Sequence, residues 1–269
     1  MNWVARTRMY DVTPEVRAHW HALLQQAARA AGVEFECIDH PAPAALTDLW
    51  SRDDLAAGFM CGFPFATHYP NVRPLAAPVT MIADGRKPTY RSVWLVSADS
   101  AFDSLPSTFG HRIGWLAKHS HSGFNAPRHA LLAHRSSERP ALYHESIGPL
   151  EHPRGALCAL ADGRVDVVAL DDWWWWLLQR YDADTASAFR PIGETRAAPI
   201  PPIVCAGSFP AVMAKGLAAA LLAMHEDRAA SSHLAALGVR HFANVARRDY
   251  DALADLDRAA RTVGYPLPV

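Results

Sequence analysis

The sequence lacks an excess of charge of either sign. Its 269 residues include 26 Lys and Arg against 27 Asp and Glu, which gives a formal net charge of −1. Proteins that bind nucleic acid through a basic surface carry a clear positive excess, so we expect no nucleic-acid partner. The sequence also lacks any run of about 18 consecutive apolar residues, the length that crosses a membrane. Half of the residues are hydrophobic, which is typical of a globular chain with a full core.

Cysteine is scarce, and its spacing excludes the common cysteine-based sites. Cys37, Cys61, Cys158 and Cys205 form no C-x-x-C pair, so neither a disulfide scaffold nor a zinc ribbon is expected. We expect all four to be small buried hydrophobic side chains. The glycine-rich phosphate loops G-x-x-x-x-G-K-[ST] and G-x-G-x-x-G are also absent, and no cofactor is expected.

Histidine is abundant, with 14 residues, and this raises the question of a metal site. His119 and His121 are two residues apart and could share one face of a strand, whereas His129 and His134 would not face each other on a helix. No H-E-x-x-H motif occurs, and no acidic cluster completes a set of three ligands. We therefore expect no metal site.

The first residues do not have the pattern of a secretory leader. A leader needs a basic segment, an apolar segment of about 7–15 residues and a cleavage site of small residues. In the opening MNWVARTRMYDVT, Arg6 and Arg8 stand where the apolar segment should be. The sequence as written therefore predicts no export by that route.

Local patterns predict short strands that alternate with helices. Thr13 can cap a first helix, Pro14 suits its first position, and Gly32 can end it. The predicted helices cover residues 14–31, about 46–54, 126–135 and 153–161, and the predicted strands cover 33–39, 57–61, 78–83, 92–97, 112–116, 141–145 and 165–170. This alternation predicts an α/β fold with mainly parallel sheet.

Two segments are suited to carry the chain between two lobes. Residues 83–88 are polar and turn-prone, and residues 195–202 contain three prolines that favour extended chain. If the chain crosses at hinges near 84–90 and 195–202, residues 1–85 plus 198–269 form lobe 1 and residues 88–196 form lobe 2, with a central cleft between them. One continuous doubly wound domain is the alternative.

The segment 118–123, between a predicted strand and a predicted helix, has the groups to bind an anion. The hydroxyls of Ser120 and Ser122 and the backbone N–H groups would form a neutral cradle at the positive end of the helix dipole. Plain capping of the helix is the alternative. Because Pro127 lacks an N–H, we expect the cap at Asn125, with Pro127 in the first turn and the serines in the preceding loop.

Other candidate residues lie at the ends of predicted strands, where open α/β sheets place ligand-binding loops. They are Tyr10 at the end of the first strand, Gly62 and Phe63 after the strand at 57–61, Tyr90 at the start of the first strand after the crossing, and Asp171 after the strand at 165–170. Tyr90 could instead be a half-buried strand aromatic, and Asp171 could be a helix cap. A nucleophilic pair of Cys61 and His152 is also conceivable, without a local signature for it.

Together these segments resemble the type 2 periplasmic-binding-protein fold in its phosphonate/phosphate branch, the substrate-binding components of ABC transporters. The resemblance covers nearly the whole chain. The pieces that carry it are Met9-Tyr10-Asp11, Cys61-Gly62-Phe63-Pro64, Tyr90-Arg91-Ser92, Ser120-His121-Ser122-Gly123, Glu151-His152, residues 161–166 with Ala169-Leu170-Asp171, and Tyr250 with Gly264-Tyr265-Pro266.

The resemblance implies two α/β lobes, joined by two crossing strands, that close around one small, anionic molecule. It implies an ABC transporter permease as partner, a periplasmic location and a monomer. By match, the anion side is formed by Tyr90, Ser120, Ser122 and Gly123, the rest of the ligand faces His152 and Asp171, and Tyr10, Gly62 and Phe63 close from the other lobe. His121 departs from the family pattern and is kept among the ligand-binding candidates.

The sequence is compatible with three different functions. The first is a solute-binding protein that captures a phosphonate- or phosphate-like ligand and performs no catalysis. The alternative is a cytoplasmic enzyme on the same fold, acting on thiamine or menaquinone precursors, with Cys61, His152 and Asp171 as the residues to replace. A ligand-sensing module without a transporter is the third. The aromatic residues Phe63, Tyr90, Trp173 and Trp174 would also suit a flat ligand.

Overall fold

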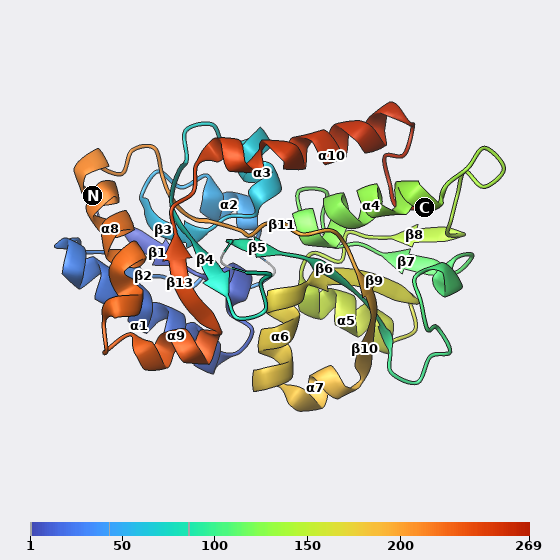
Figure 1. The fold of residues 1–269 in the computed structure, drawn as a ribbon, viewed down its shortest axis with the longest axis horizontal. Coiled ribbons are helices and arrows are strands. Elements are labelled where there is room, and N and C mark those ends of the chain that lie inside the picture. Colours follow the sequence, from blue (N-terminus) through green and yellow to red (C-terminus); the bar gives the residue numbers. More distant parts are fainter. Residues whose placement is uncertain (1, 43, 86) are drawn as a thin grey trace. The chain divides into compact units, whose positions relative to one another are not determined.

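The computed structural model describes residues 2–42, 44–85 and 87–269 (Figure 1). Arg86, which belongs to the first predicted crossing, lies outside the described residues. The chain divides into two compact units. Unit 1 comprises Met1–Thr89 and Pro199–Tyr250, and unit 2 comprises Tyr90–Ala198 and Asp251–Val269.

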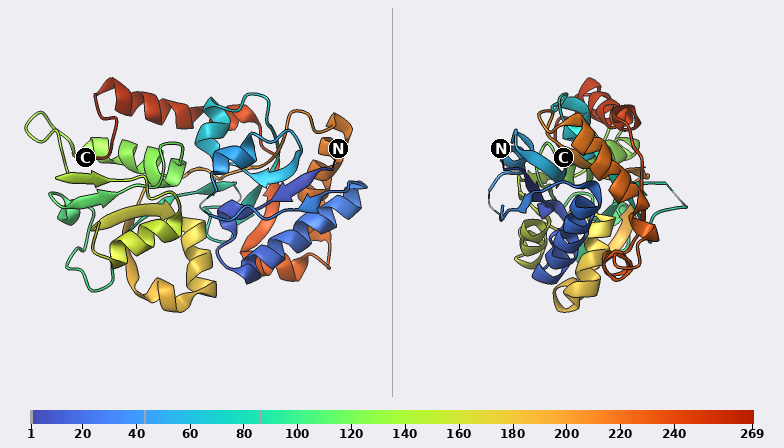
Figure 2. Two further views of the ribbon diagram at one scale, coloured as in Figure 1. Left: turned by 180° about the vertical axis from the view of Figure 1, so that it is seen from behind. Right: turned by 90° about the vertical axis from the view of Figure 1, so that its left-hand side faces the viewer.

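Unit 1 is built on a six-stranded sheet in the order β13-β4-β12-β3-β1-β2. Its strands are β1 (Val4–Arg6), β2 (Glu36–Cys37), β3 (Leu55–Phe59), β4 (Arg73–Thr80), β12 (Ile203–Cys205) and β13 (Val239–Ala243). Its helices are α1 (Pro14–Ala31), α2 (Leu46–Trp50), α3 (Gly62–Thr67), α8 (Ala211–Ala223) and α9 (Ser231–Leu237). Helix α1 packs against both α8 and α9 (Figure 2).

Unit 2 is built on a five-stranded sheet in the order β10-β6-β9-β7-β8. Its strands are β6 (Ser92–Ser97), β7 (Arg112–Gly114), β8 (Glu145–Ile147), β9 (Val167–Asp171) and β10 (Phe189–Glu194). Its helices are α4 (Ala126–Leu131), α5 (Pro153–Ala161), α6 (Asp172–Tyr181), α7 (Ala183–Ser187) and α10 (Asp251–Thr262). The short strands β5 (Thr89–Tyr90) and β11 (Ala198–Pro199) pair with each other.

Both sheets are mixed, so the prediction of mainly parallel sheet was wrong. In unit 1, β1 is parallel to β2 and β3, but β12 lies between β3 and β4 and is antiparallel to both. In unit 2, β9 is parallel to β7 and antiparallel to β6. Strand β12 follows the return of the chain from unit 2, and nothing in a strand's own hydrophobic pattern records the direction from which it enters a sheet.

The predicted start and end of helix α1 are both confirmed. Thr13 has extended backbone, and its Oγ1 accepts a hydrogen bond from the Val16 N–H at 3.3 Å. Gly32 ends the helix with φ of 63°, a left-handed conformation that costs glycine little. The buried face carries Trp20 and Leu24 at helical spacing.

The predicted strand at 141–145 was wrong, because β8 begins only at Glu145. Leu142 and Tyr143 are buried in the core of unit 2 without belonging to a strand. The Leu142 N–H donates to the Val269 carbonyl at 3.1 Å, and the Tyr143 hydroxyl lies 2.9 Å from Thr108 Oγ1. Their apolar character therefore serves to anchor a loop on the core.

The four cysteines differ in burial, which corrects one expectation. Cys61 and Cys205 are buried, and burial raises the pKa of the Cys205 thiol to about 11. Cys37 is partly buried. Cys158 is exposed, because it lies on the outer face of α5.

The run of four tryptophans belongs to α6 and serves mainly the core of unit 2. Trp173, Trp174 and Trp175 are buried in the core. Trp176 is less buried, and the Arg180 guanidinium lies 5.6 Å from the centre of its ring.

The grouping of the C-terminal residues differs from the lobes drawn from the sequence. The sequence placed residues 198–269 together in lobe 1, whereas the structure groups Asp251–Val269 with unit 2. Helix α10 packs on α4 in that unit (Figure 1). The chain thus passes between the units at residues 89–90 and 198–199, near the predicted hinges, and a third time at residues 250–251. Among the helices of the described residues, none has the length and apolar character to cross a membrane.

Candidate functional site

The segment 120–125 of unit 2, here called the Ser120 turn, is a wide helical turn that leads directly into α4. Ser120 has extended backbone, and its Oγ accepts a hydrogen bond from the Gly123 N–H at 3.0 Å. The Asn125 N–H donates to the Ser120 carbonyl five residues earlier, the bonding pattern of a π-helix. The helix is therefore capped by Ser120, and the predicted cap at Asn125 was wrong, since the side chain of Asn125 makes no capping bond.

The wide turn accommodates Pro127 through a bond from outside the helix. Pro127 has no N–H to donate to the carbonyl of Gly123, four residues before it. The Leu116 N–H donates to that carbonyl instead, at 3.0 Å. Pro127 lies in the first turn of α4, as the sequence predicted.

Gly123 is required by packing rather than by an unusual backbone conformation. A Cβ atom at this position would lie 2.4 Å from Cγ of Leu116, far inside van der Waals contact. The missing side chain therefore lets the Ser120 turn lie directly on the segment that follows β7.

His121 and Tyr90 are the candidate residues that the structure brings into direct proximity. Their ring centres are 6.1 Å apart, and both side chains are buried. Burial lowers the pKa of His121 to about 3, so the imidazole is uncharged at neutral pH. The Ser120 turn also contacts strand β9, the strand that ends at Asp171.

His152 and Asp171 both cap helices. His152 Nδ1 accepts a hydrogen bond from the Gly155 N–H at 3.1 Å, at the start of α5. Asp171 Oδ1 accepts from the N–H groups of Trp173 and Trp174, both at 2.9 Å, at the start of α6. The capping alternative that the sequence left open for Asp171 is thus present in the structure.

Asp172 is a notable residue that was not among the site candidates. Its Oδ2 accepts a hydrogen bond from the Arg91 N–H at 3.0 Å. Burial, followed by the adjacent charge of Asp171, raises its pKa to about 7. Two consecutive carboxylates at the end of a buried strand were the signal in the sequence, since one of such a pair is readily driven toward its neutral form.

The remaining candidates belong to unit 1. The Tyr10 ring is buried and meets the Phe59 ring edge to face at 4.8 Å, so it packs on the end of β3. Gly62 begins α3 shortly after that strand, and Phe63 is buried in the same helix. These three residues lie around the end of β3, as the sequence suggested for Gly62 and Phe63.

The described residues offer no site of several metal-binding side chains. Nowhere in the part of the chain that the structure describes do three or more His, Cys, Asp or Glu residues stand where they could hold a metal ion. The hydroxyl, imidazole and backbone N–H groups of the Ser120 turn and its neighbours are instead neutral hydrogen-bond donors.

Comparison with known proteins identifies a family for this sequence and solved structures that share its fold. The model of the family described as "ABC transporter, phosphonate, periplasmic substrate-binding protein" matches residues 11–250. No curated protein matches the chain. PhnD1 from Prochlorococcus marinus, solved in complex with methylphosphonate, has a TM-score of 0.77 at 15% identity, over 97% of this chain and 98% of that chain.

Two further solved structures have the same architecture. A binding protein component of an ABC phosphonate transporter from Pseudomonas aeruginosa has a TM-score of 0.72 at 15% identity, over 98% of this chain and 97% of that chain. The alkanesulfonate-binding protein SsuA from Xanthomonas axonopodis, bound to MOPS, has a TM-score of 0.62 at 17% identity, over 100% of this chain and 96% of that chain. The predicted type 2 periplasmic-binding-protein fold is thereby confirmed. Since the family model covers most of the sequence, the chain belongs to the phosphonate-type periplasmic substrate-binding proteins of ABC transporters.

Proposed function

We propose that this protein captures a small oxyanion of the phosphonate, phosphate or sulfonate type and delivers it to a transporter permease. The family supplies the general role of a substrate-binding component. The identity of the ligand is the proposal. Its main support is the Ser120 turn, where hydroxyls and backbone N–H groups gather at the start of a helix.

Neutral donors suffice to hold such an anion. Capping occupies a lone pair of the Ser120 oxygen and leaves its hydroxyl proton to be donated. A hydrogen bond between a neutral donor and a charged oxygen is stronger than one between neutral groups. The near-zero net charge of the chain is consistent with this mode of binding.

The proposed ligand contacts follow the candidates from the sequence. The anion is held by Tyr90, Ser120, His121, Ser122 and Gly123, while His152 and Asp171 face the rest of the ligand. Tyr10, Gly62 and Phe63 approach from the other lobe, and the two lobes close around the ligand. The structures of PhnD1 with methylphosphonate and of SsuA with MOPS support a phosphonate or sulfonate as the class of ligand.

The enzyme alternative is not favoured. The family is one of transporter binding proteins. Two of the three residues assigned to catalysis in that alternative, His152 and Asp171, use a side-chain acceptor atom to cap a helix.

Calorimetric titration tests the proposed function. Methylphosphonate, inorganic phosphate, an alkanesulfonate and a pyrimidine-like compound are titrated into the full chain, and we expect binding of at least one of the three oxyanions. The Ser122→Ala variant should bind it more weakly by about 1–2 kcal/mol, because one hydrogen bond to the anion is lost. Ser232→Ala, at an exposed position of α9, serves as the control. Absence of binding to every oxyanion would refute the proposal.

A further inference from the structure

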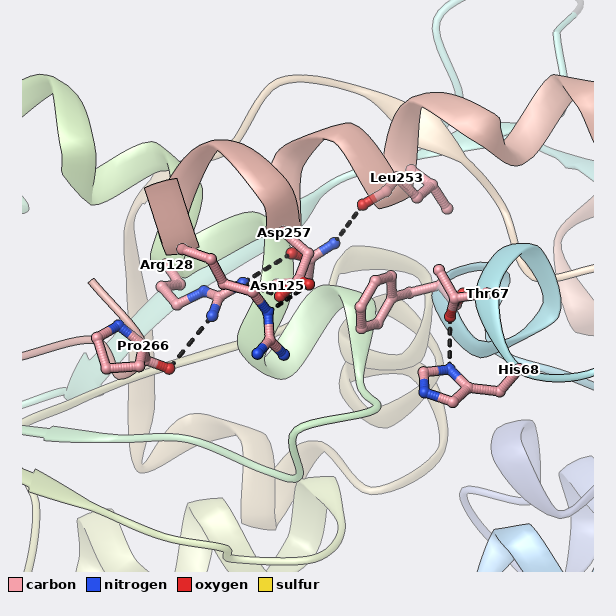
Figure 3. Close-up of polar contacts among 9 residues, drawn as sticks. Thr67, His68, Asn125, Arg128, Leu253, Asp257 and Pro266 are labelled. Atoms are coloured by element: carbon pink, nitrogen blue, oxygen red, sulfur yellow. Dashed lines mark hydrogen bonds and ion pairs between the residues drawn. The ribbon is translucent and has the colours of Figure 1, made fainter. Parts of the chain in front are cut away.

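A chain of hydrogen bonds runs from helix α10 into the Ser120 turn (Figure 3). Asn125, the last residue of the turn, is at its centre and is fully buried. Its Nδ2 donates to the Leu253 carbonyl at 2.8 Å, and its Oδ1 accepts from Nη2 of Arg128 at 3.4 Å. The turn is therefore connected by a side chain to the C-terminal helix.

These two partners determine which way the Asn125 amide points. The Leu253 carbonyl can only accept a hydrogen bond, so it must face the amide nitrogen. The guanidinium of Arg128 can only donate, so it must face the amide oxygen. Flipping the amide would turn both contacts into repulsive ones, and the orientation is therefore fixed.

Arg128 is itself held firmly. Its side chain is 1% exposed and forms an ion pair with Asp257 of α10. Nη1 donates to the Pro266 carbonyl at 3.2 Å, and the guanidinium lies 4.8 Å from the centre of the Phe124 ring. A guanidinium has N–H donors and no acceptor atom, so it can only donate to the Asn125 amide.

The fixed amide in turn determines the proton position on His121. The Nδ2 atom of Asn125 lies 3.3 Å from Nδ1 of His121 and has a second N–H to donate. Nδ1 of His121 is then the acceptor and carries no proton. A neutral imidazole has one proton, which must therefore be on Nε2.

We propose that Asn125, oriented by Leu253 and Arg128, is a positioning residue that fixes His121 as the neutral tautomer with its proton on Nε2. The ring then offers only a donor at Nε2. This role rests on the proposed function because the ligand that accepts a hydrogen bond from Nε2 is taken to be an oxyanion, whose oxygens are acceptors. A ligand group that can only donate a hydrogen bond would be disfavoured opposite Nε2, because Nε2 is a donor as well.

Because His121 stays neutral, its Nε2–H remains a hydrogen-bond donor as the pH changes. Burial lowers the pKa of His121 far below the usual histidine range, to about 3. The ring keeps the same proton from about pH 5 to pH 8. Affinity for a sulfonate, which does not titrate in that range, should then not change through protonation of this histidine.

Long-range proton–nitrogen correlation NMR of the ligand-free full chain tests the tautomer directly. We expect the His121 signal, identified by its loss in His121→Gln, to show a protonated Nε2 and an unprotonated Nδ1 at about pH 7. A signal with the proton on Nδ1, or a ring that titrates near the ordinary histidine value, would overturn the proposal.

A variant tests the part played by Asn125. In Asn125→Asp a carboxylate faces Nδ1, so we expect the proton to move to Nδ1 and the pKa of His121 to rise. Asn244→Asp adds the same charge at an exposed position of unit 1 and should leave the His121 signal unchanged. An unchanged tautomer in Asn125→Asp would show that Asn125 does not set it.

Affinity measurements connect the tautomer to the ligand. If the Nε2 donor meets the anion, Asn125→Asp should weaken binding of the oxyanion found by calorimetry about tenfold or more, and Asn244→Asp should not. Inversion of the tautomer with unchanged affinity would refute the contact with the ligand. Failure of every oxyanion to bind would refute the proposed function, while the NMR result would still decide the tautomer.

Discussion

Among single residues, Asp172 has the carboxyl group whose chemistry the fold changes most. It is partly buried beside Asp171 and Glu194, and both of these charges oppose its ionisation. The N–H groups of Arg91 and Trp173 favour the ionised form but do not offset burial, so the pKa is raised from 3.8 to about 7. A group of this kind makes the stability of the protein depend on pH.

The sign of the dependence follows from proton uptake. Between the two pKa values the folded protein binds a proton on Asp172 that the unfolded chain has released, so stability falls as pH rises through this range. Asp172→Asn cannot ionise. We therefore expect its melting temperature to exceed that of the unmodified protein at about pH 8, and the difference to shrink toward about pH 4.

Thermal melts over this pH range, with Asp162→Asn as the control, provide the measurement. Asp162 is exposed, so its replacement should give no comparable dependence on pH. A difference between Asp172→Asn and the unmodified protein that stays constant with pH would show that Asp172 is ionised in the folded state throughout.

Helix boundaries could be predicted where the determining bonds are local. Both ends of α1 were found because Thr13 and Gly32 act on residues at most four positions away. The start of the helix near residue 120 was misplaced, because it depends on the bond from Leu116 to Gly123 across a loop. The direction of β12 depends on strands more than a hundred residues earlier, and composition carries no trace of it.

Helix α6 offers a test that separates capping from ligand binding at Asp171. Asp171→Ala removes the acceptor for the N–H groups of Trp173 and Trp174 and should destabilise the protein by about 1 kcal/mol. Asp171→Asn keeps an acceptor oxygen and should nearly preserve stability, since Asn caps helices as well as Asp. If the carboxylate faces the ligand, Asp171→Asn should still change the affinity.

Denaturant unfolding and calorimetric titration of both variants give the two readouts. Thr13→Ala removes a cap of the same kind from α1 and should lower stability without changing affinity, apart from its effect on the folded fraction. Equal affinity of Asp171→Asn and the unmodified protein would leave Asp171 with a capping role alone.

The organisation of the whole molecule was predictable from sequence only in part. The turn-prone segment at 83–88 and the prolines after residue 198 indicated two passages between lobes. The third passage, at residues 250–251, was missed. The contacts that group α10 with unit 2, such as Arg128 with Asp257, join residues far apart in the sequence, and a pair of opposite charges at such a separation has no recognisable pattern.

Unfolding of the whole molecule tests whether both lobes hold the ligand, as proposed. Each unit has a sheet and buried core of its own, so differential scanning calorimetry of the ligand-free protein should resolve contributions from both. A ligand at about 100 times its dissociation constant stabilises the state that binds it by about 2.7 kcal/mol. If residues of both units contact the oxyanion, the ligand should raise the unfolding temperature of both and make them unfold together. If only the unit with the Ser120 turn binds it, the transition of that unit alone should rise, and the assignment of Tyr10, Gly62 and Phe63 to the site would be wrong.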